Sequence, residues 1–245
     1  MSQLTEVGFR REGEVAYLTL RRPEQLNALS PTLIGEALAV VKDVADTDAR
    51  VLVLSGEGKA FSAGVDTKIG LSDAFTPEVS KRFSEEAREL IVQLETIPQV
   101  TIAKVRGYCF TGGLEVALGC DLMYASDDAE FCDTHAKIGL RPGWGLSQRL
   151  PQRIGVMRAR EMSYTGRRVS AQEALRIGLV TDVAPADQLD ARVEEAVKQI
   201  VANKWYSIAN YKALYRASQN HGLDEGMGYE AAYQAPRLER RKQGV

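Results

Sequence analysis

The sequence predicts an α/β fold in which strands and helices alternate, followed by a region that is helical only. Apolar runs rich in β-branched residues recur along the chain, and segments with apolar residues at helical spacing separate them. From about Pro185 onward the pattern is helical without a convincing strand. The 245 residues, 44% hydrophobic and 26% charged, are enough for one large domain with an ample core.

The first elements follow from short local signals. An apolar run with β-branched and aromatic members, VAYLTL at 15–20, predicts the opening strand. Ser30 and Pro31 are typical of the N-cap and first residue of a helix, which we expect over 31–46. Further strands are expected at 51–56, 100–105, 121–126 and 129–132, and a long helix at 77–95.

Composition excludes several functional classes. The net charge of −2 provides no basic field for nucleic acid or for a membrane surface. No apolar run approaches the ~18 residues of a membrane span, and the first residues lack the apolar segment of a secretory signal. The odd number of cysteines (Cys109, Cys120 and Cys132) favours reduced thiols, so we expect a cytoplasmic protein. No cysteine or histidine spacing indicates a metal site.

Two segments share one pattern. Residues 51–66 read VLVLSGEGKAFSAGVD and residues 100–115 read VTIAKVRGYCFTGGLE. Both have an apolar strand, a glycine, a spacer and then F-[ST]-[AG]-G-[VL]-[DE]. The agreement between the two segments has three possible explanations, which are chance, one turn geometry used twice, or a repeated strand–loop–helix unit. In the last case each loop presents free backbone N–H groups at a helix start, and one from each could hold charge on a carbonyl oxygen, as an oxyanion hole does.

These segments resemble the enoyl-CoA hydratase/isomerase (crotonase) superfamily. The motifs KAFSAGVD, GYCFTGGLEVALGCDLMYAS and IGLRPGWGLSQRLPQRIG carry the resemblance, together with RRPEQLNAL before them and RVSAQEALRIGLVTDVAP after them. It implies a spiral of ββα units over residues 1–185 that binds acyl-CoA, and a helical region over 186–245 that forms trimers or dimers of trimers. It also implies acyl-CoA thioester substrates, with no other cofactor and no metal.

The resemblance assigns roles to individual residues. It places the two oxyanion donors at the main-chain N–H groups of Val65 and Gly112, and a catalytic glutamate at Glu115. It places Leu26 and Ala28 in the channel for adenine and pantetheine. The predicted acyl-CoA site also includes residues flanking the two amides and one aromatic side chain, namely Ala63, Gly64, Asp66, Gly113 and Trp144. Asp66, by its own chemistry, is interpreted as a partner for N–H groups at a helix start.

The sequence departs from the family pattern at one catalytic position. The second glutamate of the hydratases falls at His135 here. In the first reading, His135 replaces the missing acid, since imidazole transfers protons near neutral pH. Alternatively, Asp133 or another side chain reaches the site and His135 only packs there. In the third reading hydration is lost, and the protein binds acyl-CoA or catalyses another reaction.

The function expected is that of an acyl-CoA lyase of hydratase type, which adds or removes water across a 2,3-enoyl thioester. The alternatives are an acyl-CoA-binding relative with little hydratase activity, or another crotonase reaction such as isomerisation or hydrolysis. Trp144 is a candidate for narrowing the acyl pocket, and Arg141 for pairing with an acyl carboxylate. Lys59 and the basic segment 237–242 are candidates for CoA phosphate contacts, although a solvated surface role is the better interpretation.

Overall fold

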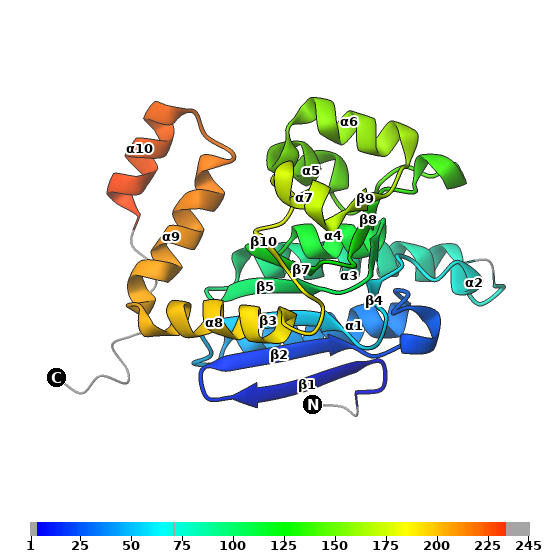
Figure 1. Ribbon diagram of the computed structural model, residues 1–245, viewed down its shortest axis with the longest axis horizontal. Helices are drawn as coiled ribbons and strands as arrows, with labels where there is room; N and C mark the ends of the chain where they lie inside the picture. Colours follow the sequence, from blue (N-terminus) through cyan, green and yellow to red (C-terminus); the bar gives the residue numbers. More distant parts are fainter. Residues whose placement is uncertain (1–3, 71, 234–245) are drawn as a thin grey trace.

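A computed structural model describes residues 4–70 and 72–233 (Figure 1). Its larger sheet has six strands in the order β1-β2-β3-β5-β7-β10. These strands are β1 (Val7–Glu12), β2 (Val15–Leu20), β3 (Val51–Gly56), β5 (Val100–Val105), β7 (Leu122–Ser126) and β10 (Asp182–Ala184). The β1–β2 pair is antiparallel and all other neighbours are parallel. This confirms the α/β class.

A second, smaller sheet has the order β4-β6-β8-β9. Its strands are β4 (Ala60–Ser62), β6 (Tyr108–Phe110), β8 (Glu130–Cys132) and β9 (Val169–Ser170). The strands β4, β6 and β8 are parallel and directly follow β3, β5 and β7 of the larger sheet. The chain therefore repeats a strand–strand unit three times, and the carboxyl ends of β4, β6 and β8 meet at one edge.

Helices α1 (Pro31–Ala45) and α3 (Pro77–Thr96) pack together over one face of the larger sheet. Ser30 caps α1 as predicted, because its hydroxyl oxygen accepts the Leu33 N–H at 3.0 Å. The other face of the sheet is covered by α8 (Leu189–Ala202), whose Leu189 and Val193 pack with Val51 and Val53 (Figure 1). The sheet is thus buried on both sides, as its continuous apolar runs require.

The remaining helices lie around the second sheet or at the end of the chain. They are η1 (Pro23–Gln25), α2 (Thr67–Gly70), α4 (Gly112–Leu118), η2 (Ala136–Ile138), α5 (Leu146–Ile154), α6 (Val156–Thr165), α7 (Ala171–Arg176), α9 (Trp205–Ser218) and α10 (Leu223–Ala232). Within the described residues, no helix combines the length and apolarity needed to cross a membrane.

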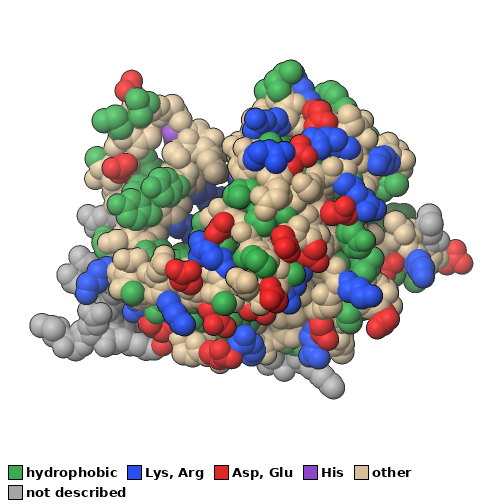
Figure 2. Space-filling view, viewed as in Figure 1, with side chains coloured by type: hydrophobic (Ala, Val, Ile, Leu, Met, Phe, Trp, Pro, Cys, Tyr) green, Lys and Arg blue, Asp and Glu red, His purple; other side chains and the backbone are tan. Residues whose placement is uncertain are grey.

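The last two helices, α9 and α10, project from the body as an arm (Figure 1). The Lys212 side chain of α9 is largely buried and pairs with Asp121 at 2.8 Å, whereas apolar residues stand exposed on both helices (Figure 2). No strand follows Ala184 among the described residues, as the sequence pattern predicts. The basic segment 237–242 lies outside the described residues.

Candidate active site

Three loops form the candidate site, one after each of the parallel strands β4, β6 and β8. The first carries Val65, the second carries Gly112 and leads to Glu115, and the third carries His135. The sequence pattern predicted the first two loops as a pair. The third was not recognised as a repeat, although it too follows a Phe-containing strand, Phe131-Cys132-Asp133-Thr134-His135.

In the first loop, Gly64 adopts a φ of +96°, a conformation that favours glycine. The N–H of Leu29 donates to the Gly64 carbonyl at 2.8 Å, and the Asp66 N–H donates to the Leu29 carbonyl at 3.0 Å. The Val65 N–H between them donates to no acceptor among the described residues. It is therefore free to bind a ligand oxygen.

The second loop holds Thr111 at a φ of +49°, which is unusual for a β-branched residue. Its N–H donates to the Cys132 carbonyl at 2.8 Å, and its hydroxyl oxygen accepts the Thr134 N–H at 3.2 Å. These bonds tie the second loop to the third. The next N–H, that of Gly112, has no acceptor within residues 4–70 and 72–233.

Three glycines of the first two loops, Gly64, Gly112 and Gly113, permit close approaches. A Cβ on Gly112 would lie 2.8 Å from Cζ3 of Trp144, and a Cβ on Gly113 would lie 2.7 Å from the Cβ of Ser62. A Cβ on Gly64 would lie 3.4 Å from the Gly112 nitrogen. The first two loops therefore touch, and α4 can begin against both β4 and Trp144 only because neither Gly112 nor Gly113 has a side chain.

Glu115 lies on α4 with an exposed fraction of only 2%. Its Oε1 accepts the backbone N–H groups of Trp144 at 2.9 Å and Leu146 at 3.1 Å. Burial raises the pKa of the carboxyl group although these hydrogen bonds and His135 oppose the rise. Because Oε1 is occupied by two backbone donors, Oε2 is the oxygen left for chemistry.

His135 and Asp133 form a pair that faces Glu115. Nδ1 of His135 lies 2.7 Å from Oδ1 of Asp133, and Nε2 lies 3.9 Å from Oε2 of Glu115. Burial alone would raise the pKa of Asp133, but hydrogen bonds from His135 and Ser163 outweigh it and lower the pKa. Asp133 therefore stays ionised and fixes the ring with Nε2 toward Glu115. The sequence left open whether His135 or Asp133 acts at the site. In the structure the two side chains form one hydrogen-bonded pair.

The raised pKa of Glu115 predicts a pH-dependent stability. The folded chain binds a proton on Glu115 more tightly than the unfolded chain does, so stability should fall as pH rises from 4.5, the ordinary pKa of this carboxyl group, through its raised pKa. We expect Glu115→Gln to be more thermostable than the wild type at neutral pH, with the advantage shrinking as pH approaches 4.5. Melting temperatures measured across this range check the sign, and an advantage that grows on acidification contradicts it.

The segment before α1 is hydrogen-bonded to the first loop and holds it in place. The sequence predicted that Leu26 and Ala28 line the CoA channel. The Leu26 carbonyl accepts the Ala63 N–H at 2.9 Å, and the Ala28 carbonyl accepts Arg22 Nη1 at 2.5 Å. Between them lies Asn27, fully buried and at a φ of +53°. Sequence reasoning missed Asn27, although an asparagine within a turn signal could have indicated it.

We expect Asn27→Ala to lower the free energy of unfolding by about 2–4 kcal/mol, because it leaves buried polar groups without hydrogen-bond partners. The Asn27 side chain donates to the carbonyls of Ala60 at 2.7 Å and Glu57 at 2.9 Å, and accepts the Arg22 N–H at 2.9 Å. Denaturant unfolding measures the loss. Asn220→Ala, at an exposed position just after the end of α9, is the control, and equal small losses in both variants would contradict the assignment.

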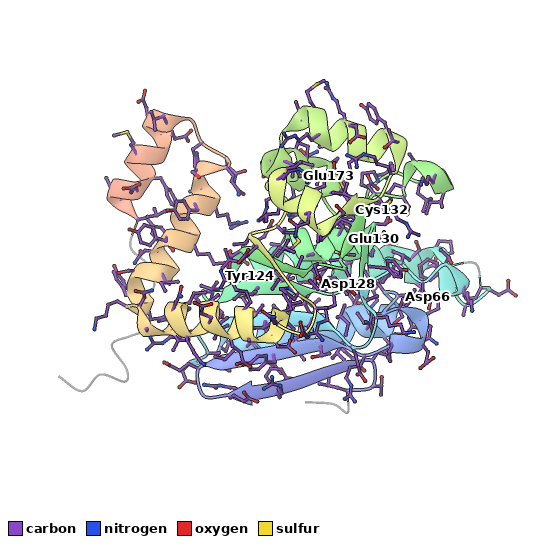
Figure 3. All side chains as sticks on the ribbon, in the orientation of Figure 1. Asp66, Tyr124, Asp128, Glu130, Cys132 and Glu173 are labelled. Atoms are coloured by element: carbon purple, nitrogen blue, oxygen red, sulfur yellow. The ribbon has the colours of Figure 1, made fainter. Side chains whose placement is uncertain are left out.

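Asp66 starts α2 at the end of the first loop (Figure 3). Its Oδ1 accepts the Lys68 N–H at 3.0 Å, and its Oδ2 accepts from Arg22 at 2.9 Å. This confirms the prediction that Asp66 pairs N–H groups at a helix start. Arg22, which sequence reasoning did not single out, thereby links the segment before α1 to the first loop.

Several other candidates lie apart from this geometry. Arg141 and Lys59 are exposed, and His221 pairs with Glu225 at 3.0 Å on the C-terminal arm. Cys132 lies on β8 beside the third loop (Figure 3), and burial raises the pKa of its thiol. A thiolate nucleophile is therefore disfavoured, as the sequence indicated.

The repeated ββα architecture is that of the crotonase superfamily. A family model described as enoyl-CoA hydratase/isomerase matches residues 10–244, and the chain belongs to this family. The resemblance predicted from the motifs is thus confirmed.

Individual relatives agree with this assignment. The chain is 31% identical to the short-chain-enoyl-CoA hydratase of Clostridium acetobutylicum, over 94% of this chain and 88% of that protein. The structure of an enoyl-CoA hydratase from Bacillus anthracis matches with a TM-score of 0.89 and 32% identity, over 93% of this chain and 88% of that one. A putative enoyl-CoA hydratase from Thermobifida fusca in complex with acetoacetyl-CoA matches with a TM-score of 0.85 and 29% identity, over 92% of both chains. These relatives support an enzyme of the crotonase superfamily.

Proposed function

We propose that this protein is an acyl-CoA lyase of hydratase type that adds water across a 2,3-enoyl-CoA double bond, or removes it. The observation that carries the proposal is the 3.9 Å separation of Glu115 Oε2 and His135 Nε2, on segments adjoining the loops that carry the two free backbone N–H groups. The acyl-CoA complex of the Thermobifida fusca relative supports a thioester substrate for this chain as well.

The free N–H groups of Val65 and Gly112 act as the oxyanion hole. When water attacks the β-carbon, negative charge moves through the conjugated system to the thioester oxygen. Backbone donors at fixed positions stabilise this enolate without the reorganisation that water would need, and each donor contributes roughly 10²–10³ in rate in other enzymes. The contact of the two loops at Gly64 supports this pairing, because it brings the loop that carries Val65 against the Gly112 nitrogen.

Glu115 and His135 transfer the two protons of the reaction, one taken from water and one added to the α-carbon. The atoms Oε2 and Nε2 are too far apart to hydrogen-bond directly, and both can bind one water between them. Glu115 takes the proton of this water as its oxygen bonds to the β-carbon, and the raised pKa makes the carboxylate a stronger base. His135 Nε2, held in place by the bond of Nδ1 to Asp133, gives a proton to the α-carbon, and the proton that Glu115 took from water passes back to His135 before the next turnover. Dehydration uses the same steps in reverse.

The absorbance of the conjugated enone in crotonyl-CoA tests the proposal. Loss of this band on addition of the purified protein, with formation of a product heavier by one water, supports hydration. A constant absorbance together with tight calorimetric binding of butyryl-CoA would instead make the protein an acyl-CoA-binding relative. A free thiol without loss of the enone would indicate thioester hydrolysis.

We further propose that the helical region 186–245 joins copies of this chain into trimers. The apolar residues exposed on its two arm helices support this, since isolated arms rarely expose such large side chains. These residues include Tyr211 at 58%, Tyr215 at 67%, Leu223 at 80% and Met227 at 62% exposed. The mass measured by sedimentation equilibrium checks the assembly, and a monomer at micromolar concentration contradicts it.

A further inference from the structure

Trp144 connects the two halves of the candidate site. Its backbone N–H donates to Glu115 Oε1 at 2.9 Å, and its indole lies against the α-carbon of Gly112, where a Cβ would come within 2.8 Å of Cζ3. The indole is 6% exposed, so it fills this space instead of lining an open channel. Trp144 therefore contacts both groups between which the reacting carbons of a thioester must lie.

Its position is fixed from several sides. The carbonyl of Trp144 accepts Arg149 Nη1 at 2.9 Å, and Arg149 also pairs with Glu95 through a contact of 2.9 Å. The indole packs edge-on against Phe83 of α3 with ring centroids 5.3 Å apart, and Phe83 packs edge-on against Phe75 at 5.9 Å. A substrate that needs the space of the indole must therefore displace a packed aromatic cluster.

We propose that Trp144 closes the acyl pocket beyond the β-carbon and restricts the protein to short-chain acyl-CoA thioesters. This inference rests on the proposed function, because it places the thioester oxygen at the N–H groups of Val65 and Gly112. With the thioester oxygen at Gly112, an acyl tail that extends along Gly112 meets the indole, which lies against the Gly112 α-carbon and packs on Phe83. Well-packed interiors resist even small insertions, so the restriction should be steep.

The test compares crotonyl-CoA with decenoyl-CoA in the wild type and in Trp144→Ala. We expect kcat/KM of the wild type to be at least about 100-fold higher for crotonyl-CoA, and this ratio to fall at least about tenfold in Trp144→Ala. Trp144→Leu keeps an apolar side chain in the core and serves as the second variant if Trp144→Ala folds poorly. It should shift the ratio in the same direction. Trp205→Ala, at the start of α9 and remote from the site, should keep the wild-type ratio.

Binding separates this inference from the proposed reaction. Calorimetry with the saturated thioesters butyryl-CoA and decanoyl-CoA needs no turnover, and Trp144→Ala should tighten decanoyl-CoA binding by about tenfold or more relative to butyryl-CoA. If no variant hydrates crotonyl-CoA but this shift appears, the reaction is wrong and the role of Trp144 stands. Equal chain-length ratios in the wild type, Trp144→Ala and Trp144→Leu overturn the inference.

Discussion

Replacement of Glu115 by glutamine is expected to lower kcat for crotonyl-CoA by roughly 10²–10⁴-fold, the usual contribution of a general base, with little change in KM. The amide oxygen of glutamine can still accept the N–H groups of Trp144 and Leu146, which lie 2.9 and 3.1 Å from Oε1 in the wild type. The loop geometry, and with it the thioester site, should survive. Only the ability of the second oxygen to take a proton from water is removed.

Steady-state kinetics with crotonyl-CoA measure this effect, and calorimetric binding of butyryl-CoA shows whether the pocket is intact. Glu130→Gln is a suitable control, because Glu130 lies on β8 near the site but pairs with Arg168 at 2.8 Å on the surface (Figure 3). Its kcat should remain close to that of the wild type. A Glu115→Gln variant that hydrates crotonyl-CoA at the wild-type rate would show that another group is the base.

His135→Gln is the second change with a large expected effect. Glutamine can donate a hydrogen bond toward Asp133, as the ring nitrogen at 2.7 Å does, but it cannot transfer a proton to the α-carbon. We expect kcat to fall by roughly 10²–10⁴-fold while butyryl-CoA binding persists. Asp133→Asn should also lower kcat, because it removes the carboxylate that orients the His135 ring.

The variant His135→Glu distinguishes this dyad from the two-glutamate arrangement of the hydratases. In this structure the variant places a third buried carboxylate beside Asp133, which is 2% exposed, and near Glu115, also 2% exposed. We expect His135→Glu to be less stable than His135→Gln at neutral pH and to recover on acidification. An active and stable His135→Glu would show that Asp133 does not define the site.

The sheet elements were largely predictable because their signals are local. The bounds of β2, β3 and β5 match the apolar runs at 15–20, 51–56 and 100–105. Strand β1 was missed because it is an edge strand whose sequence VGFRRE lacks clear alternation, with only Val7 fully buried. Because an edge strand is stabilised largely by pairing with its neighbour, its own sequence can carry only a weak strand pattern.

The candidate site was predictable in part. The repeated loop motif indicated that one backbone N–H from each loop could share a site, and the resemblance to the crotonase superfamily assigned roles there to Val65, Gly112 and Glu115. The relation of His135 to Asp133 could not be predicted, because a separation of two residues allows the side chains to meet or to diverge, depending on the backbone after β8. The role of Trp144 likewise depends on a contact across 32 residues with Gly112, for which no local pattern exists.

A crystal structure with bound butyryl-CoA measures the geometry on which the proposed chemistry depends. The thioester oxygen should lie within about 3.2 Å of both the Val65 and the Gly112 nitrogen, with the β-carbon facing Glu115 Oε2 and His135 Nε2. A thioester oxygen bound elsewhere, or in contact with neither amide, would contradict the account.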